Sequence, residues 1–171
     1  MHASSAPRPM DEAIIIQGVL VQKLLPCIAL FFACICVGDA TAQTSKEFAF
    51  MGKVTWSAFE CSSLASVAKD QLEQERLFSF GYTQGRKFLD ALRENKISQA
   101  DRSSIVPSGF LMVAEGPTAD FILGRVFEAA QENALKNVFV TDGKLNSNEL
   151  RESIAKNRHQ TQNCALIGRS K

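Results

Sequence analysis

The hydropathy pattern divides the chain into an apolar N-terminal segment and a longer amphipathic part. Residues 24–38 form an apolar run behind Lys23, and the small residues Ala40-Thr41-Ala42 follow it. A basic residue, an apolar stretch of about fifteen residues and such an A-x-A site are typical of a secretory signal peptide. We therefore predict that residues 1–42 are a signal peptide with an extended n-region, cleaved between Ala42 and Gln43.

Two other interpretations of this segment stay open at the level of sequence. A retained membrane anchor is one, because residues 13–21 lengthen the apolar stretch, although the run itself is shorter than the roughly 20 residues of a membrane-spanning helix. Attachment of a lipid at Cys34 is the other, but the bulky residues before that cysteine fit it poorly. The translation start is either Met1 or Met10.

The amphipathic part begins with polar residues 43–53, which we interpret as a flexible leader. A single helical domain is then expected over 54–171. Ser57 and Glu60 have the spacing of a capping box, so the first helix should begin there. Its apolar positions recur at helical spacing and form one buried stripe: Ala58, Cys61, Leu64, Ala65, Ala68 and Leu72.

A second helix is predicted over residues 72–94, with Leu77, Phe78, Gly81, Gly85, Phe88 and Leu92 on one face. Two glycines inside a helix cost about 1 kcal/mol each relative to alanine. Because Gly81 and Gly85 are four residues apart, they share the apolar face and would let another helix approach closely. A helix-crossing role is the prediction; a ligand groove and a helix break at Gly81 are the alternatives.

The pattern is weak between residues 97 and 116. The first half is polar and rich in serine, and the short apolar run 110–114 predicts a buried helical turn or extended segment. A third helix should open at Gly116-Pro117, since proline is favoured in the first turn. Its inner face would hold Ala119, Leu123, Val126, Phe127, Ala130 and Ala134.

The C-terminal part holds a turn and a weaker helix. Asp142-Gly143 predicts the turn, and Asn146 with Glu149 predicts the start of a fourth helix. That helix should bury Leu150 and Ile154 and fray over residues 156–163, which are polar. The fold predicted as a whole is all-α, a small bundle of four to five helices.

Cysteine usage indicates a disulfide. Only Cys61 and Cys164 of the five cysteines lie beyond residue 42. Two cysteines in an exported chain pair in most cases, because that compartment is oxidising. We predict a Cys61–Cys164 bridge that closes the bundle; two buried free thiols and a bridge to another chain are the alternatives.

Charge excludes one large class of partner. Residues 43–171 keep 17 of the 19 Lys and Arg and 15 of the 18 Asp and Glu, so the net charge is +2 and the signs are interspersed. Nucleic-acid binding requires a clustered basic surface. We therefore expect no nucleic-acid partner, even though Arg86, Lys87 and Arg93 lie near Phe80 and Tyr82, and contact with a membrane only through the signal segment.

Candidate chemistry is sparse. Residues 142–149 imitate the second half of a calcium-binding EF-hand loop, but the first and third ligand positions would be Val138 and Val140, which have no side-chain oxygen. His159 lies in a polar stretch and is interpreted as a solvated side chain, and Glu115 with Asp120 could converge in a cleft. We predict no catalytic, cofactor-binding or metal-binding residues.

These observations predict a periplasmic or secreted helical binding or accessory protein, without enzymatic activity, that acts on a protein or envelope component. The architecture is similar to small secreted helical families such as immunity proteins against delivered toxins and acid-stress chaperones, which also tie an early helix to a late one by a disulfide. The similarity concerns fold and compartment alone. The alternative is an exported enzyme with a carboxylate-based site.

Overall fold

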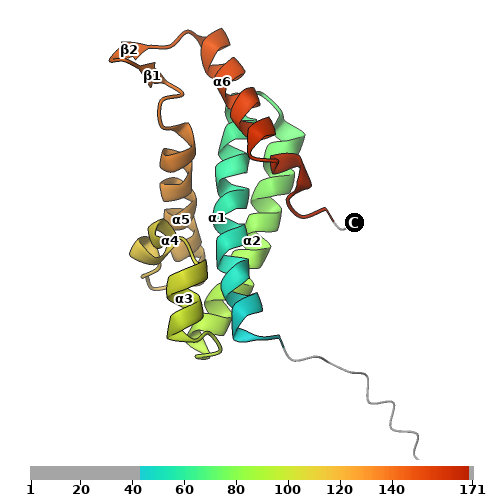
Figure 1. Cartoon of the computed structure of the whole chain (residues 1–171), viewed down its shortest axis with the longest axis vertical. Coiled ribbons are helices and arrows are strands. Elements are labelled where there is room, and N and C mark those ends of the chain that lie inside the picture. Colours follow the sequence, from blue (N-terminus) through green and yellow to red (C-terminus); the bar gives the residue numbers. More distant parts are fainter. Residues whose placement is uncertain (1–42, 170–171) are drawn as a thin grey trace, which may run out of the picture. The chain divides into compact units, whose positions relative to one another are not determined.

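The computed structural model describes residues 43–169, and the signal-peptide prediction for residues 1–42 lies outside them. The elements of the described residues, shown in Figure 1, are α1 (Ser45–Val67), α2 (Gln71–Arg93), α3 (Gln99–Ile105), α4 (Ser108–Val113), α5 (Ala119–Leu135), β1 (Val140–Thr141), β2 (Lys144–Leu145), α6 (Asn148–Thr161) and the 3₁₀-helix η1 (Cys164–Leu166). The predicted, mostly helical fold is confirmed. Residues 43–169 form six α-helices in place of the expected four to five, because the segment 97–116 contains α3 and α4.

The first helix begins earlier than predicted. Thr44 is the N-cap of α1: its side chain accepts a hydrogen bond from the Glu47 N–H, and the Glu47 carboxylate accepts one from the Thr44 N–H at 2.7 Å. This capping box satisfies free N–H groups at the helix start. Residues 45–53 are therefore helical, the prediction of a flexible leader is wrong over them, and Ser57 lies inside α1 rather than at its cap.

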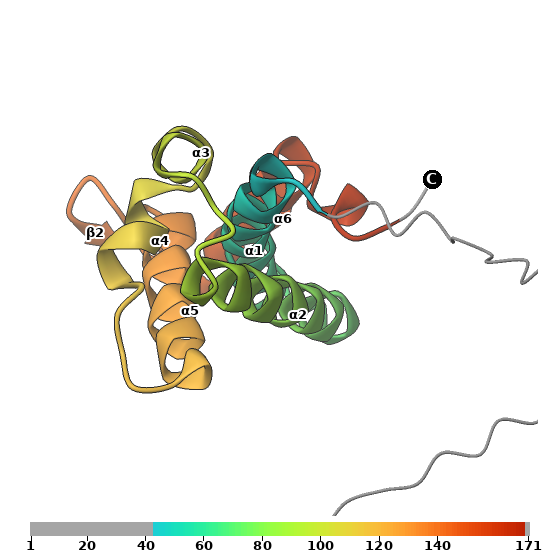
Figure 2. The same ribbon diagram turned by 90° about the horizontal axis from the view of Figure 1, so that it is seen from below.

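Helices α1 and α2 form the central pair of the bundle and lie side by side in Figures 1 and 2. The predicted second helix is confirmed within one residue at each end. A Cβ atom on Gly81 would lie 2.9 Å from Phe59 Cδ1, and one on Gly85 would lie 2.5 Å from Leu123 Cδ2 and 3.0 Å from Thr55 Cγ2. Both glycines thus lie where α2 meets its neighbours at closest approach.

Helix α5 supplies the third wall of the core. Thr118 caps it by accepting from the Phe121 N–H, just after the predicted Gly116-Pro117 opening. The predicted inner face is buried apart from Phe127, which is half-buried. The largest buried side chains of the described residues are Phe59, Phe88, Phe110, Leu64, Leu77, Leu89, Leu123, Val126 and Val138.

In the first two predicted helices, three predicted core positions are wrong or only half right. Leu72 is 82% exposed, because α1 ends at Val67 and Leu72 belongs to the first turn of the next helix. Phe78 is 40% exposed: it stacks on Phe59 with ring centroids 5.6 Å apart and leaves its outer side open. Leu92 is half-buried at the edge of the core.

The segment between α2 and α5 folds as two short helices. Ser98 caps α3, and its side chain accepts from the Asp101 N–H. Helix α4 carries Phe110, which is fully buried and meets Phe88 edge to face, with ring centroids 4.9 Å apart. Of the two predicted conformations for residues 110–114, the buried helical turn is the one observed.

A short hairpin separates α5 from α6. Asp142 and Gly143 both have positive φ, at 50° and 75°, so the predicted turn is confirmed and β1 pairs with β2 across it. Asn146 is buried, and its side-chain amide donates to the Val138 carbonyl and to Thr141 Oγ1. The predicted Asn146 cap is therefore wrong, because the Asn146 side chain holds the hairpin instead.

Helix α6 is more regular than predicted. Ser147 caps it, and it continues to Thr161 where fraying was expected. Ala155 is its buried residue, Ile154 is half-buried, and Leu150 is 47% exposed. Packing against α1 explains the difference, since tertiary contacts stabilise a helix whose own sequence is polar.

Candidate functional site

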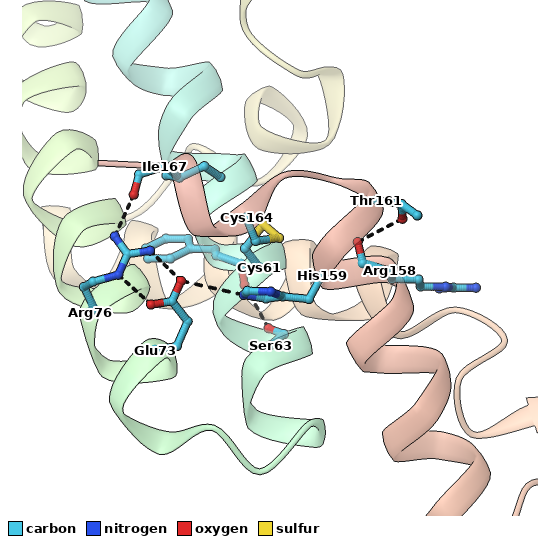
Figure 3. The surroundings of a disulfide bond; sticks show 10 residues. Cys61, Ser63, Glu73, Arg76, Arg158, His159, Thr161, Cys164 and Ile167 are labelled. Atoms are coloured by element: carbon cyan, nitrogen blue, oxygen red, sulfur yellow. Dashed lines mark hydrogen bonds and ion pairs between the residues drawn. A yellow bond between two sulfur atoms is a disulfide. The ribbon is translucent and has the colours of Figure 1, made fainter. Parts of the chain in front are cut away.

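The C-terminal end of the chain is joined to α1 by a disulfide. Cys61 of α1 and Cys164 of η1 have sulfur atoms 1.93 Å apart and Cα atoms 5.5 Å apart, and both residues are buried. Figure 3 shows the bridge where the chain turns after α6. The predicted pair is thus at bonding geometry, and it lies in a second apolar cluster with Leu64, Leu77 and Ala155.

Beside the disulfide lies a polar cluster centred on Glu73, whose side chain is only 11% exposed. Arg76 donates to it through Nε at 2.7 Å and Nη2 at 2.6 Å, and donates through Nη1 to the Ile167 carbonyl at 2.6 Å (Figure 3). His159 Nε2 and Arg169 Nη2 lie 3.8 and 3.7 Å from the same carboxylate. The hydrogen bonds from Arg76 lower the pKa of Glu73 more than its burial raises it. Glu73 is therefore a stable anion that holds the C-terminal segment.

His159 is not the solvated side chain that its sequence surroundings predict. Its side chain is 17% exposed, and its Nε2 atom is buried without a hydrogen-bond partner among the described residues. The polar stretch around it lies on α6, and the helix places His159 toward Glu73 of α2 (Figure 3). No group of three or more His, Cys, Asp or Glu side chains with metal-binding geometry occurs in residues 43–169.

The other carboxylates considered from sequence are engaged in local contacts. Asp120 accepts from the Tyr82 hydroxyl and from Arg86, each at 2.6 Å, and these two donors lower its pKa. The side chain of Arg86 thus reaches α5, and Arg93 lies 3.9 Å from Asp90 on its own helix. Glu149 lies in the first turn of α6, where hydrogen bonds from the helix start lower its pKa. The EF-hand-like residues 142–149 therefore form a hairpin turn and a helix start.

Glu73→Gln is expected to lower the free energy of unfolding at about pH 7 by about 1–3 kcal/mol, because Arg76 loses a charged hydrogen-bond acceptor in a half-buried position. The folded pKa of Glu73 is lowered, so its stabilisation is complete above the ordinary carboxyl range and is lost as the pH falls through the folded pKa. The difference between the two proteins should shrink at about pH 2.5. Urea unfolding at both pH values measures it.

Glu75→Gln is the matched control for this experiment. Glu75 lies on the same helix, is exposed, and accepts a hydrogen bond from Gln71 at 2.8 Å. The Glu75→Gln substitution should change the free energy of unfolding by less than about 0.5 kcal/mol at either pH. Equal destabilisation by Glu73→Gln at both pH values would show that the charge of Glu73 does not hold the C-terminal segment.

An open apolar groove runs along the N-terminal half of α1, and we name it the α1 groove. Its volume is about 720 Å³. Phe50, 53% exposed, lies in its floor with Met51 and Val54. One wall comes from α2 and the other from α3. The lining residues are Gln43, Thr44, Lys46, Glu47, Phe50, Met51, Lys53, Val54, Phe80, Gln84, Ser104 and Ile105.

The α1 groove begins where the C-terminal segment stops. Figure 1 shows α6 running beside the C-terminal half of α1, with η1 following it. A Cβ atom on Gly168 would lie 2.8 Å from the ring of Phe80, which is a wall residue of the groove. The chain thus covers one half of this face of α1 and leaves the other half open.

Comparison of the chain with protein-family models, curated proteins and solved structures gives no match to any of them. Within residues 43–169, no helix is both long and apolar enough to cross a membrane.

Sequence reasoning missed the α1 groove because it placed Phe50, Met51 and Val54 in or beside a flexible leader. A signal for the correct assignment is present. Thr44 and Glu47 have capping-box spacing, and Phe50 and Val54 follow at helical spacing. The same spacing at Ser57 and Glu60 pointed to a second start, and only one of the two is used.

Proposed function

We propose that this chain is an exported, non-enzymatic binding protein that takes a protein partner in the α1 groove. The observation that carries the proposal is an open apolar groove with Phe50 half exposed in its floor, on a well-capped helix. Exposed apolar surface of this kind, rimmed by polar residues, marks sites of interaction with other proteins. Its floor belongs to a helix of the central pair, so the site is already formed before a partner arrives.

Two features support export. Disulfides persist in oxidising compartments, and Cys61 and Cys164 lie at disulfide geometry. The capping box of α1 uses only Thr44 and Glu47, which both follow the predicted cleavage position. A chain that begins at Gln43 would therefore keep the start of its first helix.

The enzyme alternative draws less support. General acids and bases act most efficiently when their pKa lies near the working pH, which for a carboxyl group means a raised one. Among the described residues, every carboxyl group with a resolved shift has a lowered pKa, caused first by hydrogen bonds: Glu73, Asp101, Asp120, Glu149 and Glu152, the last at about 2. A lowered pKa is expected of carboxyl groups in ion pairs and at helix starts.

Phe50→Ala is expected to abolish capture of the partner when the exported protein is used as bait in its native envelope fraction. An exposed aromatic side chain in the floor of a groove is the residue type that forms a binding hot spot, worth about 2 kcal/mol or roughly 30-fold in affinity. Quantitative mass spectrometry of the captured proteins, after mild cross-linking, measures the change.

Phe121→Ala is the matched control. Phe121 is 50% exposed, against 53% for Phe50, and it lies on α5 outside the groove. A protein retained by Phe121→Ala and lost by Phe50→Ala is the partner that we propose. Identical capture by both variants, or no protein enriched over an empty bait, would contradict a binding function of the groove.

A further inference from the structure

One face of α1 carries a continuous row of small and apolar side chains. Phe50, Val54, Ser57, Cys61, Ala65 and Ala68 follow one another at intervals of three or four residues, so they lie along one side of the helix. The C-terminal half of this row is covered, since Cys61, Ala65 and Ala68 are at most 9% exposed. Phe50, at the other end, is 53% exposed.

The cover of the C-terminal half is itself a helix. Ala155 of α6 and Cys164 of η1 pack in one cluster with Cys61, Leu64 and Ala68 of α1. The chain therefore already places a helix against this face of α1, and the α1 groove continues the same face without one. The α1 residues that line the groove, from Lys46 to Val54, span about 12 Å at 1.5 Å per residue, which matches about two helical turns.

The charges of the groove are arranged on one edge. Lys46 and Lys53 are seven residues apart, two turns along the same flank of α1, and both are exposed. Neither forms an ion pair with another residue of the described part of the chain, whereas the groove's acidic residue, Glu47, is held in the capping box. An incoming segment thus meets two ammonium groups without an ion-pair partner on one side, Lys46 being attracted by the Asp101 carboxylate of α3, and apolar side chains beneath.

We propose that the α1 groove binds an amphipathic helix of a partner protein, with apolar residues at three- and four-residue spacing and acidic residues along one flank. The apolar side chains would pack on Phe50, Met51 and Val54, as helices do in the grooves of other binding proteins. The acidic flank would pair with Lys46 and Lys53, which selects the orientation of the helix more than it adds affinity. This inference rests on the proposed function and names the partner's chemistry.

Synthetic helical peptides of about 14 residues test it by fluorescence anisotropy with the disulfide-bonded protein. One peptide has leucines at helical spacing with glutamates on one flank, a second has lysines in place of the glutamates, and a third has the first composition with a central proline. The glutamate peptide should bind at least tenfold more tightly than either of the others. The double variant K46E/K53E should reverse the preference between the glutamate and lysine peptides.

The variant K136E/K144E is the matched control, because it changes the net charge equally at two exposed positions outside the groove. It should keep the preference of the wild type. Equal binding of the glutamate and lysine peptides, or a preference that both double variants change alike, would overturn the proposal. Binding of anionic lipid vesicles in place of peptide would also overturn it, because the groove would then be a membrane-binding site. A dimer in sedimentation that Phe50→Ala dissociates would overturn it as well, because the groove would then bind a second copy of the chain.

Failure of this inference is distinguishable from failure of the proposed function. If no peptide binds and the envelope partner is still lost by Phe50→Ala, the groove binds a protein of other chemistry and the helix proposal is wrong. If the partner is also retained by Phe50→Ala, both proposals are wrong. Binding of the glutamate peptide with loss on K46E/K53E supports both.

Discussion

Gly85→Leu is expected to lower the free energy of unfolding by about 3 kcal/mol or more. Overpacking a core typically costs about 1–3 kcal/mol. At this position the first added carbon would already lie 2.5 Å from Leu123 Cδ2, and Thr55 closes the other side at 3.0 Å. Both neighbours are buried, so each must shift against other core side chains to make room. Circular dichroism with urea measures the loss.

Gly124→Leu is the matched control, because a Cβ atom there would have no neighbour within 4 Å. Leucine is the better helix former, so this variant should gain about 0.5–1 kcal/mol. The same change of residue type thus has opposite effects at an exposed position and at a helix crossing. Equal unfolding midpoints for the Gly85 variant and the wild type would contradict the close crossing of α1, α2 and α5. If Gly85→Leu does not fold, Gly85→Ala provides the measurable version of the same test.

Replacing both cysteines, as Cys61→Ala with Cys164→Ala, is expected to lower the free energy of unfolding by about 4–5 kcal/mol. The bridge spans a sequence separation of 103. In the chain-entropy account, closing a loop of about 100 residues restricts the unfolded chain by about 4.7 kcal/mol. Alanine leaves no unpaired polar atom in the buried site. Urea unfolding of the two proteins, both without reductant, measures the difference.

Wild-type protein treated with reductant provides the control, since it should lose the same stability without a change of sequence. The double variant should also lose amide protection first in α6 and η1, because Arg76 and Glu73 then hold that segment without the bridge. Mass spectrometry of the exported, non-reduced protein gives an independent test. Two free thiols, or a disulfide-linked dimer, would contradict the intramolecular bridge.

Helices α2 and α5 could be predicted because their own residues show the spacing of an amphipathic helix. The face of α2 has Leu77, Gly81, Gly85 and Phe88 at strict helical spacing, and polar side chains occupy the opposite face. The face of α5 is equally regular, and a proline and a threonine precede it. The cysteine pairing followed from counting, since two cysteines outside the signal segment allow one intramolecular bridge.

The errors have a common cause in competition between equivalent local signals. Thr44 with Glu47 and Ser57 with Glu60 have the same capping spacing, and the tertiary structure uses the first because Ala49, Gly52 and Thr55 are buried against the rest of the bundle. Asn146 resembles a helix cap in sequence but holds the hairpin instead. Local preference is a weak constraint, and tertiary packing overrides it.

The sequence by itself determined the helical class, the extent of α2, the inner face of α5 and the pairing of Cys61 with Cys164, because each depends on periodicity or composition along the chain. Only the tertiary structure decided which apolar residues of α1 are covered. Phe50 and Ala65 lie on the same side of that helix, yet α6 and η1 cover Ala65 and leave Phe50 exposed. Burial depends on where distant segments pack, and the spacing of residues within one helix does not contain that information. The burial of His159 was decided in the same way: its neighbours in sequence are polar, but the packing of α6 places it beside Glu73.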